Sequence, residues 1–191
     1  MTSKKFIHGN FYVNDRKNAN KKAFEYLCTK QIINIYQMSK TIIKSHAELE
    51  ALVGKELGVS DWHTFTQEQI NLFADATLDH QWIHVDVDRA KKESTFGNTI
   101  AHGYLTLSIL PHLWEQIVDV QNIKDQINYG IENFRYQQPV VVNSRVRLQV
   151  KVNEVLNLRG TTKATMSVKL EIEGEKKPAY TGDIVFLYHF Q

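Results

Sequence analysis

The sequence predicts an α+β domain in which an antiparallel sheet wraps around one apolar helix. The stretch from Ala101 to Trp114 is apolar on nearly every side, as in a helix buried at the centre of a domain. After about residue 126, apolar residues instead alternate with polar ones, which is typical of strands with one buried face. Such a sheet needs an apolar cover, and the helix supplies it. Because Pro111 lies past the first turn of that helix, a kink or a break is expected there.

The alternation predicts strands joined by short turns in the last third of the chain. The turns are expected at residues 157–160 and 173–176, and connections of this length join antiparallel neighbours. The positions expected to face inward are Val146, Leu148, Val150 and Val152, then Ala164, Met166, Val168, Leu170 and Ile172, and finally Ile184, Phe186 and Tyr188.

Capping signals predict two helices before the apolar one. Thr66 and Gln69 have the spacing of a capping box, so a helix is expected over residues 66–77, with its apolar residues facing inward. Asp86 is placed to cap a second, short helix. The residues between them, Leu78 to Val85, are predicted to form a loop.

The first 45 residues differ from the rest of the chain in charge and pattern. They contain nine Lys or Arg and two Asp or Glu, a net charge of +7, whereas residues 46–191 carry −5. From Lys17 to Lys44 the chain has no Pro or Gly, and apolar residues recur near helical spacing. We therefore predict a basic amphipathic helical extension over residues 1–45 and a globular domain over 46–191, in which Ser45 caps a short helix from His46. The extension is expected to pack on its own dimer, or to contact an acidic protein or an anionic membrane surface.

Composition narrows the classes of function. The chain has 191 residues, 42% of them hydrophobic, which suffices for one core but not for two ordinary domains. No apolar run approaches the roughly 18 to 20 residues that span a bilayer, and no secretory signal is expected. Cys28 is the single cysteine, so no internal disulfide forms, and a cytoplasmic location is expected. Neither basic stripes nor aromatic-interleaved strands stand out in the domain, so we expect no nucleic-acid partner.

Asp79 and His84 are the candidate catalytic residues. They lie in the segment FADATLDHQWIHVD (residues 73–86), which is followed by FGNTIAHG (residues 96–103). This order, Asp-x4-His before Ala-His-Gly, resembles the MaoC-like (R)-specific enoyl-CoA hydratases, especially their nodulation-protein-N-like branch. The resemblance covers roughly residues 46–191 and continues, more weakly, into the strands.

The resemblance implies a hot-dog fold, usually a homodimer, with an acyl-thioester tunnel that leads to the Asp-x4-His loop. By this likeness Asp79 and His84 hold one water and add it to a trans-2-enoyl-CoA, giving an (R)-3-hydroxyacyl-CoA in a reversible reaction. Two titratable groups around one water suit this step, because the water loses a proton while the α carbon gains one. No separate cofactor is implied, since CoA is part of the substrate.

Gly103 is predicted to help stabilise the enolate that develops on the thioester. It lies where the apolar helix begins, and a helix N-terminus offers free N–H groups to an oxyanion. His102 and Gln81 are further candidates for oxyanion or substrate contacts, although a loop-locking role fits His102 equally well. His80 and His84 have a spacing that binds zinc on a helix, but they lie in a predicted loop without a third ligand, so no metal is expected.

Several alternatives stay open from the sequence. The substrate carrier is either CoA or acyl-carrier protein, and a hot-dog thioesterase or a non-catalytic acyl-binding scaffold are competing functions. Leu78 stands where many family members have Gly, which is expected to narrow or redirect the pocket. The candidates for binding the CoA phosphates are Arg135, Arg145, Arg147 and Lys176.

Overall fold

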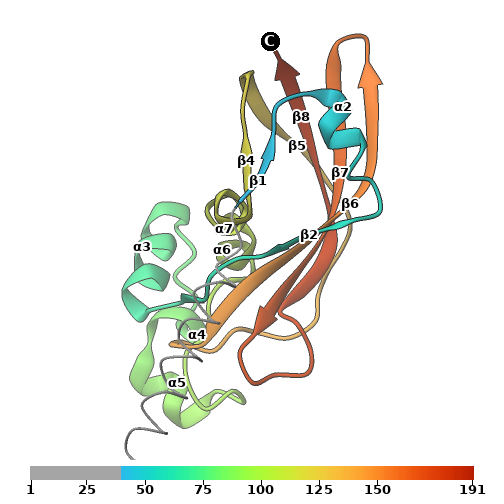
Figure 1. Cartoon of the computed structure of the whole chain (residues 1–191). Coiled ribbons are helices and arrows are strands. Elements are labelled where there is room, and N and C mark those ends of the chain that lie inside the picture. Colours follow the sequence, from blue (N-terminus) through green and yellow to red (C-terminus); the bar gives the residue numbers. More distant parts are fainter. Residues whose placement is uncertain (1–39) are drawn as a thin grey trace, which may run out of the picture. The chain divides into compact units, whose positions relative to one another are not determined.

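The structure is a computed structural model that describes residues 40–191, and Figure 1 shows its elements in chain order. The segment that leads to the central helix contains β1 (Thr41–Ile43), α2 (His46–Glu50), β2 (Glu56–Val59), β3 (His63–Thr64), α3 (Gln67–Thr77), α4 (Trp82–Val85) and α5 (Val87–Glu93). The remainder contains α6 (Gly103–Ser108), α7 (Leu110–Ile117), β4 (Val118–Val120), β5 (Ile123–Tyr136), β6 (Arg145–Leu158), β7 (Thr161–Ile172) and β8 (Tyr180–Phe190).

One antiparallel sheet of six strands forms the body of the domain. Its strand order is β2-β6-β7-β8-β5, and β3 also pairs with β6. All of the alternating positions predicted to face inward are at most 6% exposed, so this prediction is confirmed. At the β6–β7 turn, Arg159 and Gly160 both have positive φ, 56° and 100°, which matches the twist of a two-residue hairpin.

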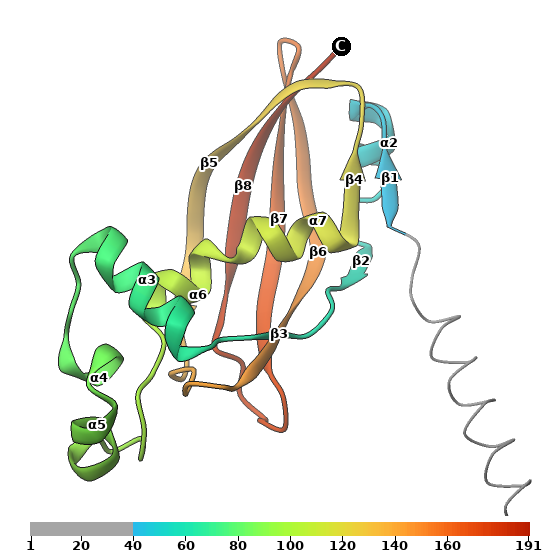
Figure 2. The same cartoon turned by 90° about the vertical axis from the view of Figure 1, so that its left-hand side faces the viewer.

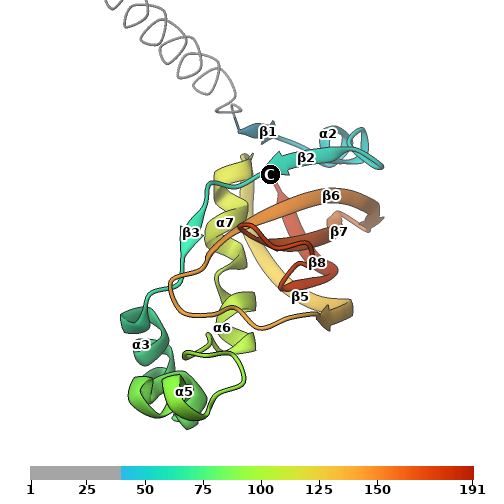
Figure 3. The same cartoon turned by 90° about the horizontal axis from the view of Figure 1, so that it is seen from below.

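The helices α6 and α7 cover the inner face of this sheet. They cross in front of the strands in Figure 2, and Figure 3 shows the sheet curving around them. Trp114 of α7 packs against Phe186 of β8, with ring centroids 5.3 Å apart. The buried residues of α7 recur at helical spacing, so one side of the helix faces the sheet: Leu110, Leu113, Trp114 and Ile117. The expected α+β arrangement, a sheet around a central helix, is confirmed.

The central helix differs from the prediction in its burial. The expected break is present, and it falls at Ile109, so that Pro111 lies in the first turn of α7, where a missing N–H is tolerated. The prediction that this helix is buried on nearly every side is wrong, because the sheet covers only one side of it and Tyr104 is 73% exposed.

Among residues 40–191, no helix has both the length and the apolar character that crossing a membrane requires.

The helix predicted over residues 17–44 is wrong at its C-terminal end. Thr41–Ile43 form the strand β1, which pairs in parallel with β4, Thr41 opposite Val118. Ile43 is fully buried in the core, so these residues belong to the packed domain. A run of β-branched residues suits a strand better than a helix. Residues 1–39 of the predicted extension, including Cys28, lie outside the described residues.

The predicted helix caps are present. The side-chain oxygens of Ser45, Thr66 and Asp86 accept hydrogen bonds from the backbone N–H groups of Glu48, Gln69 and Arg89, respectively. In α3, Ile70 and Ala74 are fully buried, as expected for its inward face. The loop predicted between the two caps is shorter than expected, because its last four residues form α4, which carries His84.

We expect Gly182 of β8 to tolerate no larger side chain, because Phe134 of β5 lies directly over it. A Cβ at this position would lie 2.7 Å from Phe134 Cδ2 and 2.9 Å from Phe134 Cα, and moving the backbone of a paired strand is costly. Gly182→Ala should lower the free energy of unfolding by about 2 kcal/mol or more. Gly130→Ala on β5 is the matched control, since its Cβ would meet only Val185 at 3.9 Å. Chemical denaturation measures both variants, and equal stabilities would contradict the prediction.

Candidate active site

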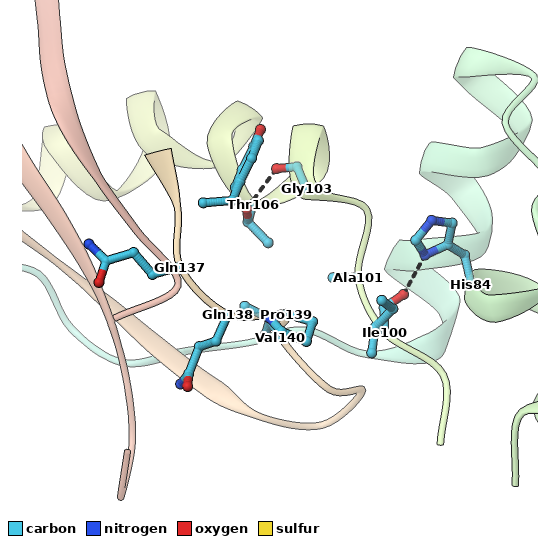
Figure 4. A pocket seen from close by; sticks show the side chains of 10 residues that line it. His84, Ile100, Ala101, Gly103, Thr106, Gln137, Gln138, Pro139 and Val140 are labelled. Atoms are coloured by element: carbon cyan, nitrogen blue, oxygen red, sulfur yellow. Dashed lines mark hydrogen bonds between the residues drawn. The ribbon is translucent and has the colours of Figure 1, made fainter. Parts of the chain in front are cut away.

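His84 is held in one orientation by its hydrogen bonds. It lies on α4 and is buried, with Nδ1 2.7 Å from the carbonyl oxygen of Ile100 (Figure 4). A carbonyl oxygen only accepts hydrogen bonds, so in the neutral ring Nδ1 carries the hydrogen and Nε2 keeps a lone pair. Nε2 has no protein partner among residues 40–191, and His84 lines a cavity. The lone pair is therefore available to a ligand.

Burial lowers the pKa of His84 below its ordinary value of 6.5. Desolvation is the largest cause, and the neighbouring His102 adds to it, whereas the Ile100 carbonyl and Asp79 act in the opposite direction. A lowered pKa leaves the imidazole neutral at neutral pH. Neutral imidazole is the form that accepts a proton, so the local environment of His84 suits a general base.

Asp79 reaches His84 through a left-handed turn at the end of α3. Leu78 makes this turn with φ 61° and ψ 19°. A carboxylate oxygen of Asp79 and a ring nitrogen of His84 lie within 4.8 Å of each other. One water that makes two hydrogen bonds of about 2.8 Å spans such a distance. The structure thus brings together the two residues predicted to be catalytic, at a distance that one shared water would bridge.

His102 contacts both of these residues from the protein interior. Its Nε2 donates to the backbone carbonyl of Asp79 at 2.9 Å, and its ring stacks on His84 with centroids 3.8 Å apart. Phe73 packs against the His102 ring at a centroid distance of 5.1 Å. His102 is only 2% exposed and is not among the residues that line the cavity. This geometry fits the loop-locking role of His102.

Asp79, His84 and His102 are close enough to be considered as metal ligands. The two imidazole planes are stacked, only 26° from parallel, whereas a metal ion must lie near the plane of each imidazole that binds it. Two nearly parallel planes 3.8 Å apart do not meet close to the nitrogens. His102 Nε2 also uses its hydrogen on Asp79. His80, the other histidine of this segment, pairs instead with Asp75 at 2.8 Å. The arrangement suits proton transfer better than metal binding.

A cavity of about 330 Å³ adjoins His84. Figure 4 shows that Gly103 and Thr106 of α6 form one wall, and that residues 137–140, after β5, form another. A side chain at Gly103 would crowd the Tyr136 ring, because a Cβ there would lie 3.1 Å from it. Gly103 lies at the cavity, so its backbone can approach a ligand there.

Two residues singled out in the sequence do not line the cavity. Gln81 is exposed and serves α4 through its backbone carbonyl, which accepts from the N–H of His84 at 2.9 Å. Leu78 is 82% exposed, so it does not narrow the pocket. Its left-handed conformation gives a physical reason for glycine at this position, since glycine adopts positive φ without a steric penalty.

Other residues at the cavity were missed by the sequence reasoning. Tyr136 lines it, and burial raises the pKa of its phenol, so the hydroxyl keeps its proton and can donate a hydrogen bond. The only sequence signal for this residue was its place in the weaker part of the resemblance.

Of the cations proposed for phosphate binding, Arg145 pairs with Glu173 and Arg147 with Glu171, both at 2.8 Å. Arg135 and Lys176 are exposed and make no ion pair within residues 40–191.

Known proteins are similar to this chain in sequence and in architecture. A family model described as MaoC like domain matches residues 48–174. The 3-hydroxyacyl-thioester dehydratase Z of Mycobacterium tuberculosis is 49% identical over 146 residues, covering 76% of this chain and 96% of that protein. Nodulation protein N of Rhizobium leguminosarum biovar viciae is 42% identical over 151 residues, covering 76% and 92%. An unliganded R-hydratase structure from Pseudomonas aeruginosa has a TM-score of 0.63 at 20% identity, covering 78% of this chain and 88% of that one. An (R)-hydratase structure from A. caviae has a TM-score of 0.58 at 25% identity, covering 70% and 94%.

The environment of His84 predicts its titration in solution. Because burial disfavours the imidazolium form, the midpoint should lie below 6.5, and the neutral ring should carry its hydrogen on Nδ1. Nitrogen-15 NMR of the histidine side chains measures both properties, with His84→Ala used to assign the signals. A midpoint above 6.5, or a hydrogen on Nε2, would contradict the described environment.

Proposed function

The chain belongs to the MaoC-like dehydratase family and is a hydro-lyase, and from this premise we propose that it hydrates trans-2-enoyl-CoA to (R)-3-hydroxyacyl-CoA, reversibly. The observation that carries the proposal is the approach of an Asp79 carboxylate oxygen, within 4.8 Å, to a neutral His84 that lines the cavity. The name of the mycobacterial relative supports a hydroxyacyl thioester as the product of hydration. The (R)-hydratase among the structural neighbours supports the stereochemistry.

The chemistry requires two proton transfers around one water. As the water oxygen bonds to C3 of the enoyl group, the water gives up a proton, and C2 takes one. Nε2 of His84 accepts the first proton, while the Asp79 carboxylate, on the other side of the water, accepts a hydrogen bond from it and orients it. The imidazolium formed at His84 then gives its proton to C2, so that both groups return to their starting states. In the dehydration direction the same groups remove the C2 proton and protonate the leaving hydroxyl.

The electrons that leave the double bond collect on the thioester oxygen, which needs hydrogen-bond donors. The N–H of Gly103 begins α6 and has no acceptor among residues 40–191, and Gly103 lines the cavity beside Tyr136. A donor aimed at the developing charge acts more strongly in a site that excludes water. We assign Gly103 this role, with the Tyr136 hydroxyl close by.

Asp79→Asn and His84→Ala test the proposal. Each removes one proton-handling group, so each should lower kcat for hydration of crotonyl-CoA by about 10²- to 10⁴-fold with a much smaller change in KM. The double variant should be little worse than either single one, because the two groups act on one water. The assay follows the loss of absorbance of the conjugated thioester, and crotonyl-acyl-carrier protein is compared to identify the carrier.

The chain offers a matched control for these variants. Asp75 and His80 form an exposed pair of the same residue types at 2.8 Å, close in sequence but outside the cavity. Asp75→Asn and His80→Ala should therefore keep near-normal turnover. Folded Asp79→Asn and His84→Ala variants with normal turnover, or a wild-type protein that forms only the (S) product, would refute the proposed function.

We also propose that two copies of the chain pair through β5. Within residues 40–191 this strand pairs only with β8, so its second edge is free, and an unpaired edge invites another strand. Three apolar side chains of β5 are 43 to 62% exposed: Ile127, Tyr129 and Ile131. Such exposure is expected where a second copy covers the strand.

Light scattering should give about twice the monomer mass, because in a homodimer each copy covers the free β5 edge of the other. Ile131→Lys should shift the protein towards monomer by placing a charge in the interface. Leu156→Lys, at a similarly exposed apolar position on β6, should leave the mass unchanged. The idea fails if the wild type is a monomer at micromolar concentration and still hydrates its substrate.

A further inference from the structure

Gln67, in the first turn of α3, contacts the backbone of the candidate base. Its Nε2 donates to the carbonyl oxygen of His84 at 2.8 Å, and also to Oδ1 of Asn71 at 2.9 Å. Its Oε1 accepts from the hydroxyl of Thr99 at 2.6 Å. Gln67 is half-buried and Thr99 is fully buried. The nitrogen and the oxygen of one amide therefore form hydrogen bonds with two segments that are distant in sequence.

These contacts close a ring of hydrogen bonds around His84. Thr99 is followed directly by Ile100, whose carbonyl holds Nδ1 of the His84 ring. The backbone carbonyl of His84 returns to Gln67, and Gln67 returns to Thr99. The N–H of Ile100 also donates to the carbonyl of Ile83, at 3.0 Å, which ties α4 to the same segment. The Gln67 side chain thus links the backbone of His84 to the segment that binds the His84 imidazole.

The orientation of the Gln67 amide is determined by its partners. A carbonyl oxygen cannot donate, so the amide nitrogen must face His84 and the amide oxygen must face Thr99. Glutamate in place of glutamine still accepts from Thr99, but it sets an oxygen against the His84 carbonyl. Methionine has a similar length and loses all three hydrogen bonds of the amide. Glutamate therefore removes only the two bonds that the amide nitrogen donates, whereas methionine also removes the bond from Thr99.

From this geometry we infer that Gln67 is a positioning residue for the reaction: it holds His84 so that Nδ1 stays on Ile100 and Nε2 stays available to a ligand. The inference rests on the proposed function, in which Nε2 handles a proton. Gln67 does not line the cavity and is not a catalytic residue. The titratable groups next to His84 are Asp79 and His102, and the ring contacts of His102 do not involve Gln67.

The test compares Gln67→Met and Gln67→Glu with the wild type in hydration of crotonyl-CoA. Both variants should lower kcat by about 10- to 100-fold and leave KM within about twofold, because a displaced base affects proton transfer more than substrate binding. Gln69→Met is the matched control. Gln69 lies on the same helix and makes one side-chain contact of similar length, 2.9 Å to His63, but it does not touch His84. Gln69→Met should retain wild-type kcat.

Nitrogen-15 NMR of His84 provides a readout that does not depend on activity. In folded Gln67→Met protein, the preference of the neutral ring for a hydrogen on Nδ1 should weaken, while Gln69→Met should leave it unchanged. Folded Gln67 variants with normal kcat and an unchanged His84 signal would overturn the inference, as would a change in KM alone. If the wild type hydrates no enoyl thioester, the proposed function fails, and the NMR comparison still decides whether Gln67 positions His84.

The substitutions Thr99→Val and Thr99→Ser test the same ring from its other side. Valine removes the hydroxyl that bonds to Gln67, so Thr99→Val should lower kcat and alter the His84 signal in the same direction as Gln67→Met. Thr99→Ser keeps the hydroxyl and should restore both. These variants also decide the matter if Gln67→Met does not fold, because equal kcat values for the serine and valine variants would then overturn the inference.

Discussion

The inner face of the sheet buries an unbroken set of apolar side chains against α7, and this contact fixes where the candidate site lies. Burying each large apolar side chain contributes about 1.5 to 3 kcal/mol, so the register between α7 and the strands is strongly determined. Since α6 leads directly into α7, the same packing sets the position of Gly103 and of the residues that precede it. The position of the cavity therefore depends on the packing of α7, none of whose residues lines it.

Much of the fold follows from local patterns in the sequence. Strands β6, β7 and β8 were predicted because alternation is a property of neighbouring residues and because their turns are short. The errors occur where the partner is distant. Thr41–Ile43 form a strand only because β4, more than seventy residues later, lies beside them. The burial of Tyr104 was overestimated because an apolar sequence does not reveal that the sheet covers only one side of the helix.

Only part of the candidate site could be predicted from the sequence. Asp79, His84 and Gly103 were predicted because their spacing carries the resemblance, and the structure places His84 and Gly103 at one cavity and brings Asp79 close to His84. Gln67 and Thr99 carry no such signal, because glutamine and threonine are ordinary residues at a helix start and in a loop. Their importance arises from hydrogen bonds that exist only after α3, α4 and the segment before α6 have packed together.

The strand order also constrains how the chain assembles during synthesis. Strands β6, β7 and β8 are joined by hairpins and pair with their neighbours in sequence, whereas β2 and β3 pair with β6, which begins more than eighty residues later. Contacts between distant residues form slowly, because a long loop must close first. Residues 40–100 therefore leave the ribosome before the strand that β2 and β3 join. The contacts of the β6–β8 meander close shorter loops than those that connect β2 and β3 to the sheet.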